Sequence, residues 1–312
     1  ITVIGSAGNR LINMVYAPKF AKLSFRKLNL KRHLKSVFML MAVNLAIEIY
    51  SLVDVTMLDI MCDKENVAFY SYGSRIHKTL LQIVNSFTMV VVPRMSLYYK
   101  EQKYNEFNNL LSRTLKLLVI LSLPMIVGLW FTASDIICLL YTDAYINSAQ
   151  IVKILSFLLL ISPIGYLLGS RVLLAVGDES KMVLCVSLGA IVNITGNYFL
   201  IKLFAEFGAA IASVLSETVV MIVYVGMGKK YFKLKDIFRD VAKIVCVVSI
   251  MAMFLWLFSL LNINVIAKLT IEIIVACIVY FGMLVVIKEQ IALESMNGIR
   301  KRFLRKCTRK NI

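Results

Sequence analysis

Residues 70–93 read YSYGSRIHKTLLQIVNSFTMVVVP, a segment long and apolar enough to cross a membrane although its first third contains Arg75 and Lys78. An α-helix needs about 20 mostly apolar residues to cross a bilayer core. Segments of this kind recur along the chain, at 36–58, 70–92, 115–133, 151–174, 182–204, 209–227, 241–261 and 269–287. The pattern predicts an all-α, polytopic membrane protein.

The composition supports this fold class. Hydrophobic residues make up 60% of the chain and charged residues 17%, and the mean hydropathy is +0.80. These values are outside the range that is usual for soluble domains. Residues 2–18 have the pattern of the last part of a further helix, and the chain begins with Ile1 rather than methionine. We therefore expect a C-terminal portion of a longer protein.

The net charge of +17 is explained by membrane topology. Most of the 35 lysines and arginines lie in alternate connections, at 19–35, 94–116, 171–181, 229–243 and 288–310. The intervening connections hold only Lys64, Lys202 and Lys268. By the positive-inside rule, the basic connections face the cytoplasm. The sequence thus predicts a cytoplasmic C-terminus. It also favours the interpretation that the excess of lysine and arginine sets the membrane topology rather than binds nucleic acid.

Enzyme and cofactor chemistry is not indicated. The six cysteines are scattered singly, without the spacing of a metal site or a disulfide framework. The outward connections 59–69, 134–150, 205–208 and 262–268 are too short to build a catalytic domain. Asp135 and Asp143, in the second of these connections, are expected to be solvated loop acids or helix caps. We expect a protein that is not an enzyme and that uses no cofactor or metal.

Polar residues form one stripe along the helix predicted at 70–92. Ser71, Arg75, Lys78, Gln82 and Asn85 follow one another at steps of three and four, so they share a face. Ionisable groups within a span are costly and usually face a wet cavity or a partner. Arg75, Lys78, Gln82 and Asn85 are therefore candidates for lining a cavity inside the helix bundle. The alternative is that Arg75 and Lys78 snorkel to the outer membrane interface.

An acidic stripe, at Asn44, Glu48, Ser51 and Asp54, runs along the helix predicted at 36–58. The opposite directions of the two helices place Asp54 at a depth similar to that of Arg75, with Glu48 roughly 9 Å deeper. In-membrane carboxylates often carry a coupling proton or cation, so Glu48 and Asp54 are candidates for that role. A structural pairing between helices, such as Asp54 with Arg75, is an equal alternative.

Three later spans contain further polar positions. Lys153 starts its span on the outer side, where a place in an outer basic vestibule competes with snorkelling. Asn193 and Asn197 share a face, which suits hydrogen bonding between helices as well as a cavity lining. The residues 208, 212 and 216 form a ridge of small side chains that predicts close helix packing. Glu217, one residue off this ridge, is a candidate cavity acid.

Other polar and helix-bending positions are expected to have structural roles. His77 points away from the polar stripe and is expected to be an interface residue. Glu272 is expected in the first turn of the last helix, where a carboxylate suits the helix dipole. Pro124 and Pro163 interrupt spans and predict kinks.

Several motifs, taken in order, resemble the Wzx-type oligosaccharide flippases of the multidrug/oligosaccharidyl-lipid/polysaccharide exporter superfamily. They are Asp54-Val-Thr-Met-Leu, YSYGSRI at 70–76, VVVPRMS at 90–96, LSLPMIVGL at 121–129, VGDESK at 176–181, Asn193 with Asn197, and GAAIASVLSE at 208–217. The resemblance covers residues 36–232. It implies two lobes of six helices each around a central cavity, working by alternating access.

The resemblance also implies a division of the chain. Residues 1–35 would be the end of a preceding helix and a basic cytoplasmic connector. Residues 36–232 would be the second six-helix lobe, 233–288 two additional helices, and 289–312 a basic cytoplasmic tail. The first lobe would precede this chain.

That family moves undecaprenyl-pyrophosphate-linked oligosaccharides, of O-antigen, capsule or teichoic type, across the bacterial cytoplasmic membrane. The resemblance implies a lipid-linked oligosaccharide as substrate, with membrane lipids and a polymerase or other glycan-assembly proteins as partners. The planar fork of Arg75 suits a pyrophosphate. Two alternatives stay open, namely a multidrug or small-cation antiporter of the same superfamily, whose cavity should be dominated by acids, and a membrane component of glycan assembly that does not transport.

Overall fold

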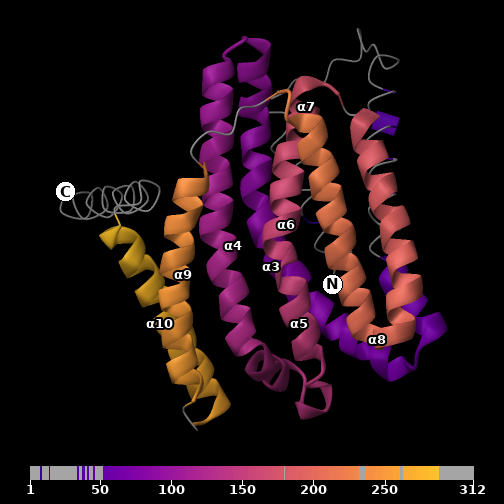
Figure 1. Ribbon diagram of the computed structural model, residues 1–312, viewed down its shortest axis with the longest axis vertical. Coiled ribbons are helices and arrows are strands. Elements are labelled where there is room, and N and C mark those ends of the chain that lie inside the picture. Colours follow the sequence, from indigo (N-terminus) through magenta and orange to yellow (C-terminus); the bar gives the residue numbers. More distant parts are fainter. Residues whose placement is uncertain are drawn as a thin grey trace. The chain divides into compact units, whose positions relative to one another are not determined.

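The computed structural model (Figure 1) describes residues 52–178, 180–231, 237–260 and 263–287, together with the isolated positions 8, 14, 34, 37, 38, 41 and 45. The chain divides into two compact units, 1–41 and 42–312. The described residues from 45 onward belong to the second unit. Glu48, most of the span predicted at 36–58, and the basic tail from residue 288 onward lie outside the described residues.

The described part of the chain is helical and contains no strand, which confirms the predicted fold class. A helical segment at 52–61 comes first. It is followed by α3 (Lys64–Lys100), α4 (Tyr104–Leu140), the short 3-10 helix η2 (Asp143–Tyr145), α5 (Ser148–Ser156), α6 (Leu158–Gly165), the π-helical turn η3 (Tyr166–Arg171), α7 (Val172–Val176), α8 (Ser180–Gly228), α9 (Ile237–Ser259) and α10 (Val265–Val286). The predicted spans from residue 70 onward all coincide with these helices.

The element α8 is two antiparallel helices joined at Ala205. The backbone of Ala205 has φ 48° and ψ −126°, which reverses the chain without a separate loop. The two halves then pack closely, because a Cβ added at Gly196 would lie 3.3 Å from the Cβ of Ala212. The ridge of small residues predicted at 208, 212 and 216 is buried, as expected.

Several helices extend beyond the predicted spans. The helices α3 and α4 each have 37 residues, which is about 55 Å at 1.5 Å per residue, against a bilayer core of about 30 Å. The outward connection expected at 59–69 is therefore mostly helix, with only Cys62 and Asp63 outside helical geometry. Asp135 lies within α4 rather than in a loop. Amphipathic helix ends outside the hydrocarbon carry no apolar signal, which is why hydropathy shortened them.

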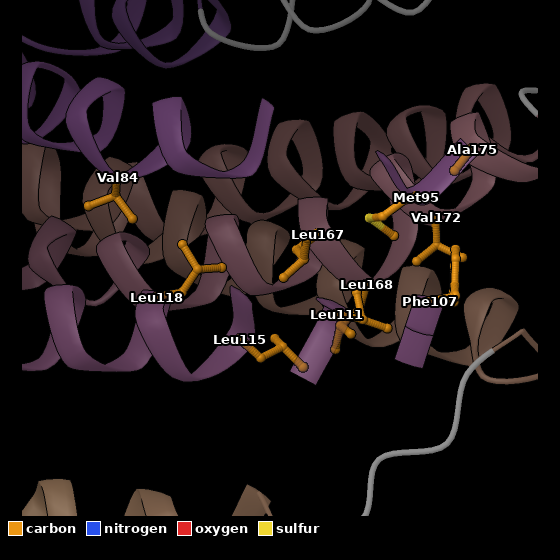
Figure 2. Packing of buried hydrophobic residues seen from close by; sticks show 10 residues of the cluster. All are labelled: Val84, Met95, Phe107, Leu111, Leu115, Leu118, Leu167, Leu168, Val172 and Ala175. Atoms are coloured by element: carbon orange, nitrogen blue, oxygen red, sulfur yellow. The ribbon is translucent and has the colours of Figure 1, made fainter. Parts of the chain in front are cut away.

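Apolar side chains hold α3, α4, η3 and α7 together, as Figure 2 shows. The α3 residues Val84 and Met95 face Phe107, Leu111, Leu115 and Leu118 of α4 and Leu167, Leu168, Val172 and Ala175 of η3 and α7. The π-helical turn begins three residues after Pro163, which removes a backbone donor from α6. Two glycines of this region, Gly165 and Gly169, lie against Met221 and Tyr224 of α8.

The last two helices, α9 and α10, pack on α4 at the side of the unit. Their shared apolar cluster includes Ile120 of α4 together with Val247 and Leu255 of α9. The Tyr280 hydroxyl of α10 donates a hydrogen bond to the Ile120 carbonyl oxygen at 2.6 Å. These helices contribute no residue to the polar cluster around Asp54 that is described next, which agrees with a peripheral position.

Candidate functional site

The carboxylate of Asp54 is the centre of a buried polar cluster. Its Oδ2 accepts hydrogen bonds from the Tyr70 hydroxyl and the Ser213 hydroxyl, both at 2.6 Å. Its Oδ1 accepts from the Nδ2 of Asn193 at 2.9 Å and from the Nδ2 of Asn197 at 2.7 Å. Asp54 is 6% exposed. Four donors, from α3 and from both halves of α8, therefore surround one buried carboxylate. Hydrogen bonds of this kind stabilise a buried charge without a cation.

The local sequence explains why the donors converge. Asn193 and Asn197 are four residues apart and so lie on one face of the first half of α8. The second half returns alongside it because small residues line both helices, and this return brings Ser213 to the same carboxylate. Of the two alternatives for Asn193 and Asn197, the structure shows hydrogen bonding between helices.

A second buried acid lies close to this cluster. Glu217, on the second half of α8, accepts a hydrogen bond from the Ser162 hydroxyl of α6 at 2.9 Å. It lines a cavity of about 150 Å³ together with Asp54, Tyr70, His77, Lys78 and Tyr166. The structure thus gathers two of the three predicted cavity acids, Asp54 and Glu217, around one cavity. Glu48 cannot be placed because it lies outside the described residues.

The predicted basic stripe of α3 faces away from the Asp54 cluster. The buried face of α3 carries Tyr70, Gly73, Ser74 and His77, because a residue with a Cβ at Gly73 would press on Ile151 of α5 at 2.8 Å. Arg75 and Gln82 are exposed, and Lys78 is exposed but also borders the cavity. Of the structural pairings left open for Asp54, the structure shows hydrogen bonds between helices, and the alternative pairing with Arg75 is not formed, since none of the four donors to Asp54 is Arg75.

The cations of the stripe form no ion pair with another described residue, and the same holds for Lys153, which is half-buried on α5. Asn85, farther along the same stripe, is half-buried and its Oδ1 is buried without a hydrogen-bond partner among those residues. The exposed part of the stripe, at Arg75, Lys78 and Gln82, is suited to meeting a charged ligand or a further part of the protein.

A polar cluster between α4 and α10 was missed by the sequence reasoning. The Asp135 carboxylate of α4 forms an ion pair with the Lys268 ammonium of α10 at 3.0 Å. Glu272 is fully buried one turn after Lys268, and neither of its carboxylate oxygens has a hydrogen-bond partner among the described residues. The expectation that Glu272 lies in the first helical turn is wrong, because α10 begins at Val265.

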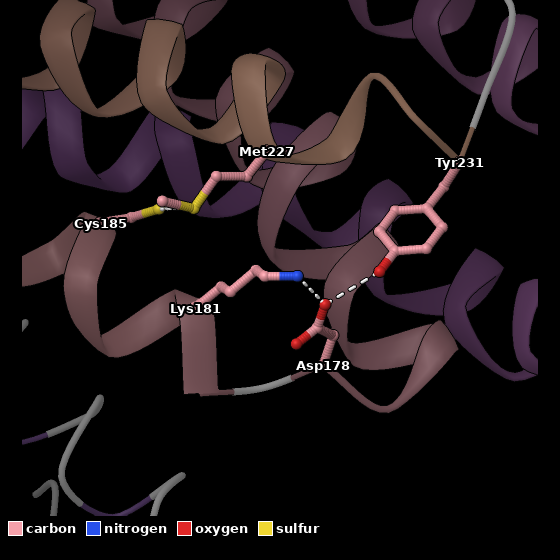
Figure 3. A network of polar contacts seen from close by, with 5 residues as sticks. All are labelled: Asp178, Lys181, Cys185, Met227 and Tyr231. Atoms are coloured by element: carbon pink, nitrogen blue, oxygen red, sulfur yellow. Dashed lines mark hydrogen bonds and ion pairs between the residues drawn. The ribbon is translucent and has the colours of Figure 1, made fainter.

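The opposite end of the unit carries a cluster at the turn between α7 and α8 (Figure 3). The Asp178 carboxylate accepts hydrogen bonds from the Lys181 ammonium and, at 2.8 Å, from the Tyr231 hydroxyl. The hydrogen bond from Lys181, followed by that from Tyr231, holds the pKa of Asp178 below its ordinary value. Figure 3 also shows the Cys185 thiol directed at the Met227 sulfur of the other half of α8. This cluster ties the two ends of the α8 hairpin to the turn.

A comparison with models of known protein families identifies the family of this chain. The model of a family described as Lipid II flippase MurJ matches residues 7–276. The chain belongs to the lipid II flippase MurJ family. Membership of a flippase family, which the motifs implied, is thereby confirmed, but the family that matches is MurJ rather than the Wzx-type one that the motifs resembled. No curated protein gives a significant sequence match.

Solved structures show the same fold. A lipid II flippase MurJ in an inward closed conformation superposes with a TM-score of 0.69 at 20% identity, over 86% of this chain and 57% of that chain. An outward-facing multidrug resistance MATE family transporter of the MOP superfamily gives 0.55 at 15% identity, over 83% and 65%. A MOP superfamily transporter from Pyrococcus furiosus, described by the reverse polarity of its binding pocket, gives 0.56 at 15% identity, over 79% and 61%. The chain thus spans little more than half of the MurJ structure that it matches.

Proposed function

We propose that this chain is the second lobe of a flippase that moves a polyprenyl-pyrophosphate-linked glycan across the bacterial cytoplasmic membrane. The glycan is lipid II, the substrate in the family's name, or a lipid-linked oligosaccharide of the kind implied by the motifs. The observation that carries the proposal is that the cations of the α3 stripe form no ion pair with another described residue. Arg75 is exposed there beside Lys78, Gln82 and Asn85, and a guanidinium binds the oxygens of a pyrophosphate in two parallel hydrogen bonds.

The division of the chain follows from this role. We propose that residues 36–232 form the lobe, with α9 and α10 as two added helices and 289–312 as a cytoplasmic tail. The exposed stripe of α3 would then face the central cavity opposite a first lobe, with Lys153 at its outer mouth. The share of the MurJ structure that the chain covers, 57%, supports this arrangement.

The acids of the unit supply a means of coupling. We propose that Asp54 binds a coupling proton or cation and that it gives up hydrogen bonds from its present donors when it does so. Glu217 is a second acid in the same cavity. Each of the Asp54 donors is a side-chain amide or hydroxyl, and these groups also offer oxygens to a cation after rotation. A change of occupancy there would alter the packing of both halves of α8 on the segment 52–61.

A multidrug or small-cation antiporter remains the second candidate. The MATE and Pyrococcus furiosus transporters have the same fold, and Asp54 and Glu217 are acids of the kind that such a cavity would need. The exposed cations Arg75 and Lys78 favour an anionic substrate instead, because a cationic drug would be repelled by them.

The decisive experiment replaces Arg75 in the complete protein and measures glycan-lipid translocation in cells. Arg75→Ala should abolish translocation while the protein still inserts at normal abundance. Arg75→Lys should restore only part of it, because an ammonium keeps the charge and loses the fork. Arg94→Ala, an exposed arginine farther along α3, is the matched control and should leave translocation unchanged. Full translocation by an inserted Arg75→Ala protein would refute the role of Arg75 as the pyrophosphate ligand.

A further inference from the structure

His77 lies on the buried face of α3 and its ring is 4% exposed. Its Nε2 atom is buried without a hydrogen-bond partner among the described residues. Buried polar atoms are nearly always paired, so an orphaned ring nitrogen indicates a water molecule or an ion that completes the site. The sequence had suggested an interface residue. The helix instead turns His77 inward, because the glycine and serine at 73 and 74 let this face approach α5.

The orphaned nitrogen belongs to a residue that lines the cavity of about 150 Å³. Six titratable side chains line this cavity, and they are Asp54, Tyr70, His77, Lys78, Tyr166 and Glu217. The facing part of α5 is apolar, and α6 contributes Ser162 as its polar group. A water molecule occupies roughly 30 Å³ in the liquid, so a polar cavity of this size has room for water. His77 therefore has both a space and polar neighbours with which to exchange a proton.

Two carboxylates line the cavity together with His77, those of Asp54 and Glu217. The Asp54 carboxylate accepts four hydrogen bonds that hold the segment 52–61 to α3 and α8. Glu217 lies on the second half of α8, and its carboxylate accepts a hydrogen bond from the Ser162 hydroxyl. The Lys78 ammonium on the same cavity disfavours a second positive charge, and a carboxylate such as that of Glu217 favours one on the His77 ring.

We propose that His77 is a proton-binding site that takes up a proton on Nε2 from water in this cavity, with Glu217 as the balancing carboxylate. A hydronium ion gives its proton to the ring nitrogen and leaves as water, and the product is an imidazolium ion facing a carboxylate. The inference goes beyond the transport function proposed above. It assigns a proton site to a residue that does not lie on the substrate face of α3.

A line of further unpartnered atoms leads from the cavity along the seam between η3 and α8. Tyr166 lines the cavity, and its ring centroid lies 6.3 Å from that of Tyr224. The Tyr224 hydroxyl and the Arg171 Nε are both buried without a hydrogen-bond partner among the described residues. Tyr166 and Arg171 begin and end the π-helical turn, a geometry that is frequent at functional sites. These residues connect the cavity residue Tyr166 with α7, which leads to the turn at Asp178.

The test measures hydrogen–deuterium exchange at the C2 carbon of histidine by mass spectrometry, on the chain of residues 1–312 in lipid nanodiscs. The exchange rate of this carbon follows the protonation of the ring and requires contact with water. The chain has two histidines, His33 and His77, so His33 serves as an internal standard. The proposal expects a sigmoidal pH profile for His77. Exchange at His77 that is far slower than at His33 at every pH would show a dry packing residue and overturn the proposal.

The role of Glu217 is tested by a matched pair of variants. Glu217→Gln should move the midpoint of the His77 profile to lower pH by about one unit, because the facing charge is lost. Glu206→Gln removes another buried acid of α8 that does not line the cavity, and it should leave the midpoint in place. An unchanged midpoint in Glu217→Gln, or an equal change in both variants, would overturn the proposal. Neither readout depends on transport, so the result stands apart from the proposed function.

Discussion

The Nδ2 atom of Asn197 lies 2.7 Å from the Oδ1 atom of Asp54, although 143 residues separate them in the sequence. This hydrogen bond, with those from Asn193, Tyr70 and Ser213, joins the segment 52–61 to α3 and to both halves of α8. A hydrogen bond to a charged, buried group contributes more to stability than one between neutral groups. Asp54 therefore holds the helices of this unit in register as well as being the proposed coupling acid.

The first prediction concerns the stability that Asp54 provides. Asp54→Asn would replace one carboxylate oxygen by an amide group whose hydrogens face two of the four donors, and it should lower the free energy of unfolding by about 2–4 kcal/mol. Thermal unfolding of the purified chain, followed by helical circular dichroism, measures the loss. Asp59→Asn is the matched control, because the Asp59 side chain is 48% exposed and pairs only with exposed Lys64. That control should change stability by less than about 1 kcal/mol, and equal losses in the two variants would contradict the prediction.

The second prediction concerns the close approach of η3 to α8. A methyl group at Gly169 would overlap the Tyr224 side chain, so Gly169→Ala should destabilise the fold by about 1–3 kcal/mol through overpacking. Gly128→Ala on α4 is the control, because a Cβ there meets nothing within 4 Å. In a helix interior this second change should be neutral or stabilising by up to about 1 kcal/mol. Gly169→Ala should lower the melting temperature, whereas Gly128→Ala should leave it unchanged or raise it. A Gly169→Ala protein as stable as the wild type would contradict the prediction, because it would show that Tyr224 can move aside.

The third prediction concerns the polar cluster of Asp135, Lys268 and Glu272 between α4 and α10. Glu272 is fully buried with both oxygens unpartnered among the described residues, so Glu272→Gln removes no hydrogen bond and should leave the melting temperature equal or higher. Lys268→Met should lower stability, because it leaves the largely buried Asp135 carboxylate without its ion-pair partner, at a cost of about 1–3 kcal/mol. Both variants are compared by the same unfolding assay. A large loss in Glu272→Gln alone would mean that the Glu272 carboxylate has a stabilising partner.

The fourth prediction concerns pH and the turn at Asp178. The hydrogen bonds from Lys181 and Tyr231 hold the pKa of Asp178 below its ordinary value, which is about 3.9 in an unfolded chain. A lowered pKa stabilises the fold fully above the unfolded value, and this stabilisation is lost as the pH falls through the folded value. Asp178→Asn should therefore be less stable than the wild type at neutral pH, and the difference should shrink below about pH 4. A difference that stays constant from pH 7 to pH 3 would contradict this account.

The helices are the part of this protein that its sequence predicts. Each span from residue 70 onward coincides with a helix because hydrocarbon demands apolar side chains and internally paired backbone groups, which are properties of the segment itself. The shared face of Asn193 and Asn197 and the small-residue ridge ending at Ser216 were predictable for the same reason, since helical periodicity is local. The short connections were predicted less well, because helix ends that leave the hydrocarbon carry no apolar signal.

Only the tertiary structure decided which faces meet. The sequence left a pairing of Arg75 with Asp54 open as an alternative, yet Asp54 is surrounded by Tyr70, Asn193, Asn197 and Ser213, and Arg75 is exposed. The inward position of His77 likewise follows from the fit of Gly73 against Ile151. A stripe of polar residues shows that a helix has two faces, but it does not show which face a neighbour will cover. That choice depends on side-chain volumes contributed by segments far away in the chain, and periodicity within one helix contains no information about them.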